Sequence, residues 1–189
     1  MSWLNYRIVW WGKAVLIELD VDDIVAENKI IKERLIWKQE NSTVYVIEPI
    51  EVKSKIHNSI IFQVRHSPNK LSLVLRDPTT RPSQIFRRYD TCPLHRNPSG
   101  EILPPGHKHK WTDAFEERVA YMPNPPINPP TNGEEIYQAI VDFLDECNIN
   151  LEQGVENYPK PDAHVQRTLG DYLYPRDEIS VEEEFFDDI

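Results

Sequence analysis

Cysteine is scarce in this sequence, which contains only two among its 189 residues, Cys92 and Cys147, and no Cys-x-x-Cys pair. Two isolated thiols exclude a disulfide framework and a four-cysteine zinc site, and they are typical of a protein that works in the reducing cytoplasm. Glycine is scarce as well. Six glycines stand against sixteen prolines, a ratio that predicts stiff rather than flexible loops.

The sequence also lacks long hydrophobic runs. The apolar stretch at residues 8–17 is interrupted by Lys13, and it is shorter than the roughly 18 residues that a membrane-spanning helix needs. No basic segment or small-residue cleavage site accompanies it, as a secretion signal would require. P-loop, G-x-G-x-x-G, H-E-x-x-H and G-x-S-x-G motifs are absent, which removes support for nucleotide-binding proteins and the common hydrolases. We therefore expect a cytoplasmic protein with no membrane partner and no cofactor.

Positive and negative charge are concentrated in different parts of the chain, whose net charge is −10. Residues 53–118 contain 12 Lys and Arg against 6 Asp and Glu, and they hold five of the six histidines. Residues 119–189 contain 3 Lys and Arg against 16 Asp and Glu. A local positive field can attract a polyanion such as RNA even when the whole chain is acidic. Basic side chains on the solvent face of a sheet would give the same composition.

The strand and turn pattern predicts an α+β fold. Residues 5–18 are rich in β-branched and aromatic residues and predict a strand or a hairpin, and a helix is expected after Asp20, with an apolar period that extends to Leu35. Closely spaced strands without intervening helices then indicate an antiparallel meander. These strands are expected at residues 43–50, 59–65, 70–76 and 84–89.

The second half of the chain predicts one more helix and an acidic extension. Residues 107–121 are compatible with either a short helix or a last strand. A capping box at residues 131–134 predicts a helix that ends near Asn148. We therefore expect a curved antiparallel meander of about five or six strands flanked by two helices. It would form a single domain at residues 1–150, with a motif-bearing core at about 43–148.

The remaining residues, 151–189, predict an acidic C-terminal region that is partly irregular or disordered. Its last fifteen residues carry seven acidic side chains and one basic side chain around Phe185 and Phe186. Such a segment could fold back and mask the basic stretch, or mimic nucleic acid for a protein partner. It could also serve solubility alone.

The densest group of reactive side chains surrounds the end of the last meander strand. Residues 86–96 are Phe-Arg-Arg-Tyr-Asp-Thr-Cys-Pro-Leu-His-Arg, and residues 106–110 are Gly-His-Lys-His-Lys. Loops that leave a rigid strand end are frequent positions of functional sites. The candidate catalytic residues are Arg88, Tyr89, Asp90, His95, His107 and His109. The candidate RNA- and phosphate-binding residues are Arg65, Arg87, Arg96, Lys108 and Lys110.

Three interpretations of these residues stay open. Histidine and tyrosine could act as general acid and base on an RNA 2′-hydroxyl, with Arg88 stabilising the charge of the phosphorane and Asp90 orienting a histidine. Alternatively, a metal ion could be bound by a set of three nitrogens and one oxygen. That set would be His95, His107, His109 and Asp90. The third interpretation is ordinary hydrogen bonding that holds a proline-rich loop together.

The same stretch resembles a known family. The segments IFRRYDTCPLH and GHKHKW, preceded by the strand KLSLVLR and followed by an amphipathic helix, are similar to the TumE-like family of prokaryotic toxin–antitoxin proteins. The resemblance covers about residues 60–148. It matches the strand-end triplet at residues 88–90, the turn histidine at His95 and the paired histidines at His107 and His109. The loop at residues 96–106 is longer than the family pattern, and the N-terminal segment and the acidic region are additions to it.

The resemblance implies a growth-inhibiting toxin that acts on RNA and is neutralised by a protein antitoxin. Together with the residue types, it predicts metal-independent phosphodiester cleavage. The alternative expectation is a non-catalytic interaction protein of a defence or anti-defence system, which would bind a protein partner through its acidic C-terminal third.

Overall fold

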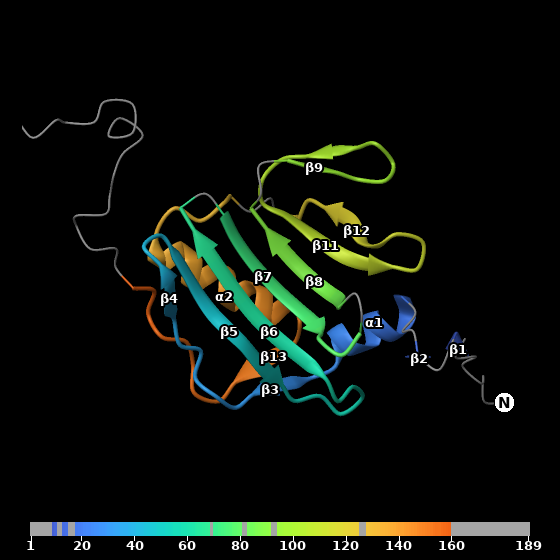
Figure 1. The fold of residues 1–189 in the computed structure, drawn as a ribbon, viewed down its shortest axis with the longest axis horizontal. Helices are drawn as coiled ribbons and strands as arrows, with labels where there is room; N and C mark the ends of the chain where they lie inside the picture. The colour runs from blue at the N-terminus through green and yellow to red at the C-terminus, as the bar shows by residue number, and fades with distance from the viewer. Residues whose placement is uncertain are drawn as a thin grey trace, which may run out of the picture. The chain divides into compact units, whose positions relative to one another are not determined.

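The computed structural model describes residues 9–10, 13–14, 18–68, 70–80, 83–91, 94–124 and 128–159 (Figure 1). Residues Met1–Tyr158 belong to one compact unit. Cys92 and the acidic tail beyond Pro159 lie outside the described residues. Most of the predicted strand at residues 5–18 lies outside them too. Within that stretch, β1 (Val9–Trp10) pairs antiparallel with β2 (Lys13–Ala14), as the hairpin alternative predicts.

A seven-stranded antiparallel sheet forms the centre of the molecule, and it confirms the predicted α+β fold. The sheet has more strands than the five or six expected. One reason is that residues 107–121, which were compatible with a helix or a strand, form a hairpin of two strands; a short edge strand adds to the opposite side. In spatial order the strands are β12 (Glu116–Tyr121), β11 (His107–Thr112), β8 (Gln84–Asp90), β7 (Lys70–Asp77), β6 (Ile60–Ser67), β5 (Val44–Val52) and β4 (Lys38–Asn41).

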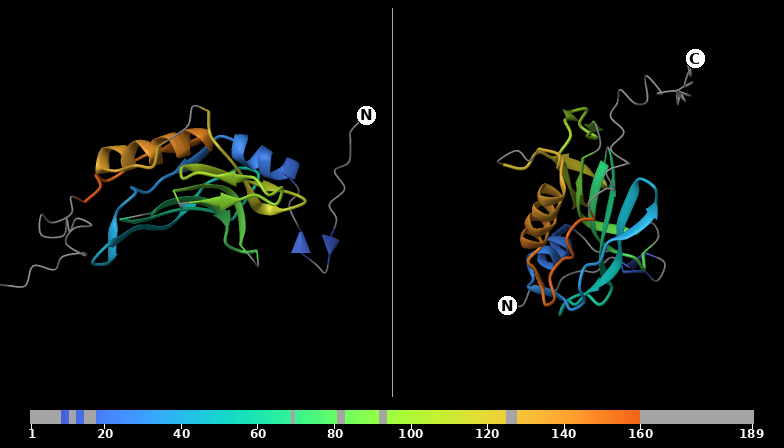
Figure 2. Two further views of the ribbon diagram at one scale, coloured as in Figure 1. Left: turned by 90° about the horizontal axis from the view of Figure 1, so that it is seen from above. Right: turned by 90° about the vertical axis from the view of Figure 1, so that its left-hand side faces the viewer.

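Both described helices lie on the same face of this sheet (Figure 2). They are α1 (Glu18–Ala26) and α2 (Gly133–Glu146). The apolar face of α2 packs onto the sheet, where the rings of Phe143 and Phe62 lie 5.9 Å apart, and Ile140 and Leu73 are fully buried in the same core. We call this side the helix face. The opposite side, called the outer face, is covered by neither of the described helices.

Helix α2 begins where the capping box at residues 131–134 predicts a helix, but the N-cap lies one residue later than Thr131, and Glu135 takes the place expected of Glu134. Asn132 is the N-cap, and its side chain accepts a hydrogen bond from the backbone N–H of Glu135 at 3.0 Å. The carboxylate of Glu135 in turn accepts from the backbone N–H of Thr131 at 2.6 Å. These contacts satisfy backbone donors that the first turn of a helix leaves free. Neither described helix is long and apolar enough to cross a membrane.

The expectation that the first helix continues toward Leu35 was wrong. Helix α1 ends at Ala26, and residues Lys29–Ile31 form β3, which pairs parallel with β13 (Ile149–Leu151). The buried ammonium of Lys29 donates hydrogen bonds to the carbonyls of Ile24, Val25 and Glu27 and so caps the end of the helix. A cation at a helix C-terminus also favours the helix dipole.

The chain between β8 and β11 forms a separate small hairpin. Its strands are β9 (His95–Arg96) and β10 (Ile102–Leu103), which pair antiparallel. In Figure 1 this hairpin lies beyond the ends of β8 and β11. The long loop of the predicted motif is therefore ordered by its own strand pairing, and it brings His95 back towards the sheet.

Candidate functional site

The register of β11 against β8 assigns the predicted residues to the two faces of the sheet. His107 lies opposite Asp90, and His109 lies opposite Arg88. Residues directly opposite one another on paired strands share a face. Lys108 contacts Glu146 of α2, so its neighbours in the strand, the two histidines, must point to the outer face. Asp90 and Arg88 lie there with them.

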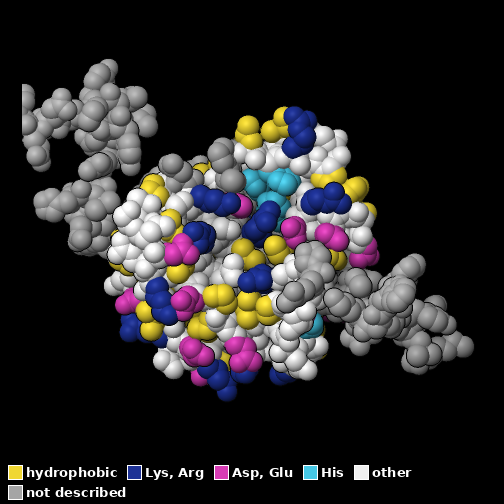
Figure 3. Space-filling view, in the orientation of Figure 1, with side chains coloured by type: hydrophobic (Ala, Val, Ile, Leu, Met, Phe, Trp, Pro, Cys, Tyr) yellow, Lys and Arg dark blue, Asp and Glu magenta, His cyan; other side chains and the backbone are white. Residues whose placement is uncertain are grey.

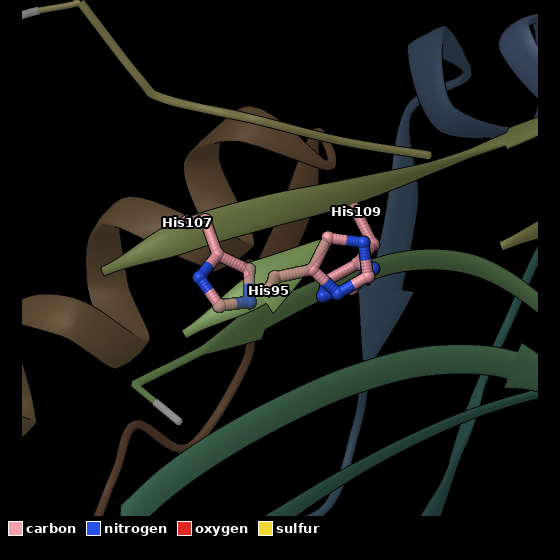
Figure 4. A group of neighbouring side chains, drawn as sticks. All are labelled: His95, His107 and His109. Atoms are coloured by element: carbon pink, nitrogen blue, oxygen red, sulfur yellow. The ribbon is translucent and has the colours of Figure 1, made fainter. Parts of the chain in front are cut away.

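His95 from the small hairpin joins the two histidines of β11. The ring centroid of His95 lies 5.2 Å from that of His107 and 4.6 Å from that of His109, and the centroids of His107 and His109 are 5.0 Å apart. One nitrogen from each ring lies within 4.8 Å of the others (Figure 4). His107 and His109 are each 1% exposed, and His95 is half-buried. We call these three residues the histidine triad.

Backbone carbonyl groups orient all three rings. Nδ1 of His107 lies 2.9 Å from the carbonyl oxygen of Pro104, and Nδ1 of His109 lies 3.0 Å from that of Glu117. In His95 it is Nε2 that lies 3.0 Å from the carbonyl oxygen of Arg118. A carbonyl can only accept a hydrogen bond, so these nitrogens carry the protons. In the neutral rings a lone pair is left on Nε2 of His107, Nε2 of His109 and Nδ1 of His95.

Arg88 lies against the ring of His109. Its Nη2 is 3.2 Å from Nδ1 and 3.1 Å from Nε2, and such nearly equal distances place the guanidinium over the face of the ring. The in-plane lone pair of Nε2 is therefore left free. Burial, and then the charge of Arg88, lower the pKa of His109 to about 3, and burial also lowers the pKa of His107. Both rings are neutral at pH 7, so neither can serve there as a general acid.

Asp90 is buried on the outer face among cationic side chains. Its Oδ2 lies 3.4 Å from Nζ of Lys70 and 3.9 Å from Nε of Arg88. Sequence reasoning missed Lys70. The antiparallel pairing of β7 with β8 could have revealed it, because that pairing brings the first residue of β7 beside the end of β8.

Tyr89 does not join the cluster, in contrast to the prediction. Successive residues of a strand point to opposite faces, so the side chain between Arg88 and Asp90 enters the core beneath the helices. Tyr89 is 2% exposed, and its hydroxyl has no hydrogen-bond partner among the described residues. Burial raises the pKa of Tyr89 to about 12. A phenol of that pKa, on the far side of the sheet, is not placed to exchange protons with a ligand at the triad.

The same alternation removes three predicted phosphate contacts from the outer face. Lys108 forms an ion pair with Glu146 beneath α2. Arg87 binds the carboxylate of Asp22 in α1 at 3.1 Å, and Lys110 lies directly opposite Arg87 in the strand register. The structure therefore assigns these three cations to the helix face, where two of them attach helices to the sheet.

Arg65 and Arg96 are the predicted phosphate contacts that remain accessible. Arg65 lies on the outer face but not next to the triad, because β7 separates its strand β6 from β8. Its guanidinium forms a two-pronged ion pair with the carboxylate of Glu40, with a shortest distance of 2.6 Å. Arg96 is exposed on the small hairpin and donates to the carbonyl of Gly100 at 3.4 Å.

The surface around the triad is polar and largely cationic. In the space-filling view, histidine side chains gather at one place on the outer face, and Lys and Arg side chains border them (Figure 3). Lys70 and Arg88 are the cations that reach Asp90 at this place. Three lone pairs and two cations therefore meet on one side of the sheet. That combination can bind an anion, accept a proton or hold a metal ion.

A second unpredicted residue fastens the small hairpin to the sheet. Asn97 is buried, and its side-chain amide bonds to the backbone of Ala120 in β12 at 2.7 and 2.9 Å. Asparagine after a short strand carries no distinctive sequence signal, so only the folded structure reveals this contact.

Comparison with known proteins assigns the chain to a family. A family model described as a family of unknown function, DUF6978, matches residues 16–149, a span that contains both described helices, the main sheet and the histidine triad. No curated protein and no solved structure matches the chain. Since the matched span is well over half of the 189 residues, the chain belongs to the DUF6978 family.

Proposed function

We propose that the protein acts on RNA at the outer face, as the toxin-like component of a prokaryotic toxin–antitoxin or defence system. A protein antitoxin would then be its partner. The observation that supports this most directly is the meeting of the histidine triad with Arg88 and Lys70 on the outer face of the sheet. RNA cleavage needs a proton acceptor and positive charge at the same phosphodiester, and this place offers both.

The proposed reaction is transfer of the phosphoryl group to the neighbouring 2′-oxygen. A bond forms between O2′ and phosphorus, and the bond between phosphorus and O5′ breaks. The 2′ proton passes to a base, O5′ receives a proton, and the products carry a 2′,3′-cyclic phosphate and a 5′-hydroxyl. Arg88 would stabilise the added negative charge of the phosphorane.

The pKa shifts of the triad limit its roles in this reaction. His107 and His109 are neutral at pH 7, so in a metal-independent reaction they could accept the 2′ proton but could not supply the proton for O5′. His95 is the least buried of the three rings and is our candidate donor. The sequence alone favours His107 or His109 as the acid or the base, and this proposal gives them the role of base only.

The test is expression of the wild-type chain and a His107→Asn/His109→Asn variant in a tightly controlled bacterial host, with growth and total RNA as readouts. His66→Asn is the matched control, because His66 is a half-buried histidine on the helix face. We expect growth arrest and RNA loss with the wild type and the control but not with the double variant. Circular dichroism of the purified proteins checks that the double variant folds.

The chemistry is tested separately with purified protein and a short RNA. Products that end in a 2′,3′-cyclic phosphate support the proposed transfer. Intact RNA and normal growth with the wild type would overturn the proposal and would favour the interaction protein that binds a partner through its acidic C-terminal third.

A further inference from the structure

We infer that His95, His107 and His109 form a binding site for one transition-metal dication of the zinc class. The inference deepens the proposed function, on which its catalytic meaning rests, but metal binding itself needs no RNA. It starts from the donor set. Three imidazoles within 4.8 Å of one another, two of them in a His-x-His pair on one strand, are the ligand type and number of an open zinc site.

The proton positions favour a metal over an ordinary hydrogen-bonded cluster. Each ring directs its single N–H outward to a carbonyl group, those of Pro104, Glu117 and Arg118. Backbone carbonyls are common second partners of metal-bound histidines, because they fix the tautomer and the ring orientation. Each ring is thus left with one nitrogen that no carbonyl contacts, namely Nε2 of His107, Nε2 of His109 and Nδ1 of His95, and these are the atoms that could bind a metal. A cation is the species that such a set binds best.

Burial strengthens this argument for the two histidines of β11. Both are 1% exposed, so their rings are held by packing and need little reordering when a metal arrives. Arg88 lies over the face of the His109 ring and not in the plane of its free nitrogen, so it does not occupy the ligand position. Its charge and that of Lys70 oppose a metal at this place, and the buried carboxylate of Asp90 opposite His107 offsets one of these two charges.

A bound metal would require the three nitrogens to move closer together. Zinc–nitrogen bonds of about 2.0–2.1 Å in tetrahedral geometry require nitrogens about 3.3 Å apart, whereas the triad spans up to 4.8 Å. The rings on β11 are held inside a seven-stranded sheet. His95 lies on a two-residue strand of the small hairpin, so this hairpin can close on the metal. A metal should therefore order the hairpin more than it orders the sheet.

The chemistry of the ligands selects the metal. Imidazole nitrogens suit Zn²⁺, Co²⁺, Ni²⁺ and Cu²⁺, whereas Mg²⁺ and Ca²⁺ prefer oxygen ligands. Three protein ligands leave a fourth position for water or for a phosphate oxygen. In the proposed RNA reaction, hydroxide on the metal would accept the 2′ proton and become water, so the cleavage would depend on metal, contrary to the metal-independent reaction predicted from the sequence.

The test is titration of Zn²⁺ into the untagged, chelator-treated full chain, followed by calorimetry. We expect one site per chain whose affinity falls about 100-fold or more in His95→Ala, since changes to partners beyond the ligands alone cost 10–100-fold. His95 is half-buried on the small hairpin, so this variant should fold even where replacements at 1% exposed positions do not. His66→Asn is the control and should bind as the wild type does.

Two further measurements test the coordination geometry and the metal selectivity of the site. The absorption spectrum of the Co²⁺-loaded wild type should show tetrahedral nitrogen coordination, and excess Mg²⁺ or Ca²⁺ should not displace the metal. No zinc binding at all would overturn the site. Equal zinc binding by the wild type and by His95→Ala would also overturn it, and would assign the bound metal to the acidic side chains. RNA cleavage by a zinc-free chain would overturn the catalytic role of the metal while leaving the proposed function standing. Zinc binding without RNA cleavage would overturn the proposed function while leaving the metal site standing.

Discussion

The side-chain amide of Asn97 pairs with the backbone of Ala120 as another strand would. Oδ1 of Asn97 accepts from the Ala120 N–H at 2.7 Å, and Nδ2 donates to the Ala120 carbonyl at 2.9 Å. Ala120 lies opposite His109 in the register of β12 and β11. Asn97 lies two residues beyond His95, so this pair sets the position of His95 relative to the rest of the triad.

Replacement of Asn97 by alanine should therefore loosen the triad. The change leaves two backbone groups of Ala120 unpaired in a buried place, and we expect the free energy of unfolding to fall by about 1–3 kcal/mol. Because His95 loses its anchor, zinc affinity should fall by about tenfold. Urea denaturation and calorimetric titration measure the two effects. Ser99→Ala, in the exposed turn of the same hairpin, is the control, and equal zinc affinity in both variants would contradict the anchoring role.

Substitutions at Lys108 and Arg88 test which face of the sheet binds RNA, because Lys108 lies on the helix face and Arg88 on the outer face. Lys108→Met breaks the ion pair with Glu146 beneath α2, so it should lower the free energy of unfolding by about 1–3 kcal/mol and leave RNA affinity unchanged. Arg88→Met removes the cation that lies against His109 and should weaken RNA binding. Filter binding at fixed salt compares the folded variants. A Lys108 variant that is stable but no longer binds RNA would show that the outer face is not the RNA surface.

Lys29 should be one of the most sensitive positions for stability. Its ammonium satisfies three carbonyls at the end of α1, and methionine would leave these groups without that donor in a buried place. Methionine avoids the cost of burying a charge, but the unpaired carbonyls outweigh that gain. We expect Lys29→Met to lower the free energy of unfolding by about 2–4 kcal/mol. The exposed Lys32→Met should change it by less than about 0.5 kcal/mol, and comparable losses in the two variants would refute the capping role.

Stability should fall as the pH is lowered below about 6.5, the ordinary pKa of histidine. Burial lowers the pKa of His66, whose ring packs edge-on against Tyr158, so the unfolded chain binds a proton that the folded chain excludes. Protonation therefore favours the unfolded state as the pH falls. His107 and His109 act in the same direction. His66→Gln should make the pH dependence shallower without abolishing it, as urea denaturation between pH 5 and 8 would show. An unchanged slope would mean that His66 does not contribute.

Local sequence patterns predicted the fold class and most of the residues that meet at the candidate site, but not Lys70. Period-two alternation identifies the meander strands, and the Thr-Asn-Gly-Glu segment marks the start of α2, because both signals arise between residues close in the chain. The His-x-His spacing implies a shared face for His107 and His109 on any strand. The sequence left open whether residues 107–121 form a helix or a strand. The two strands there are only six residues each, too short to show a clear period of two.

Only the tertiary structure decided which predicted residues meet. Alternation along β8 and β11 places their side chains in two groups, one on each face of the sheet. Which group faces the helices depends on where α1 and α2 pack, and their packing buries Tyr89 and Lys108. The end of α1 depends on a buried lysine and on pairing with β13, more than a hundred residues away. His95 reaches the triad through a loop whose course is fixed by Asn97 and Ala120. The sequence by itself therefore determined the residue types and the strand periods, whereas contacts between distant segments, whose free energy depends on packing in three dimensions, determined the site.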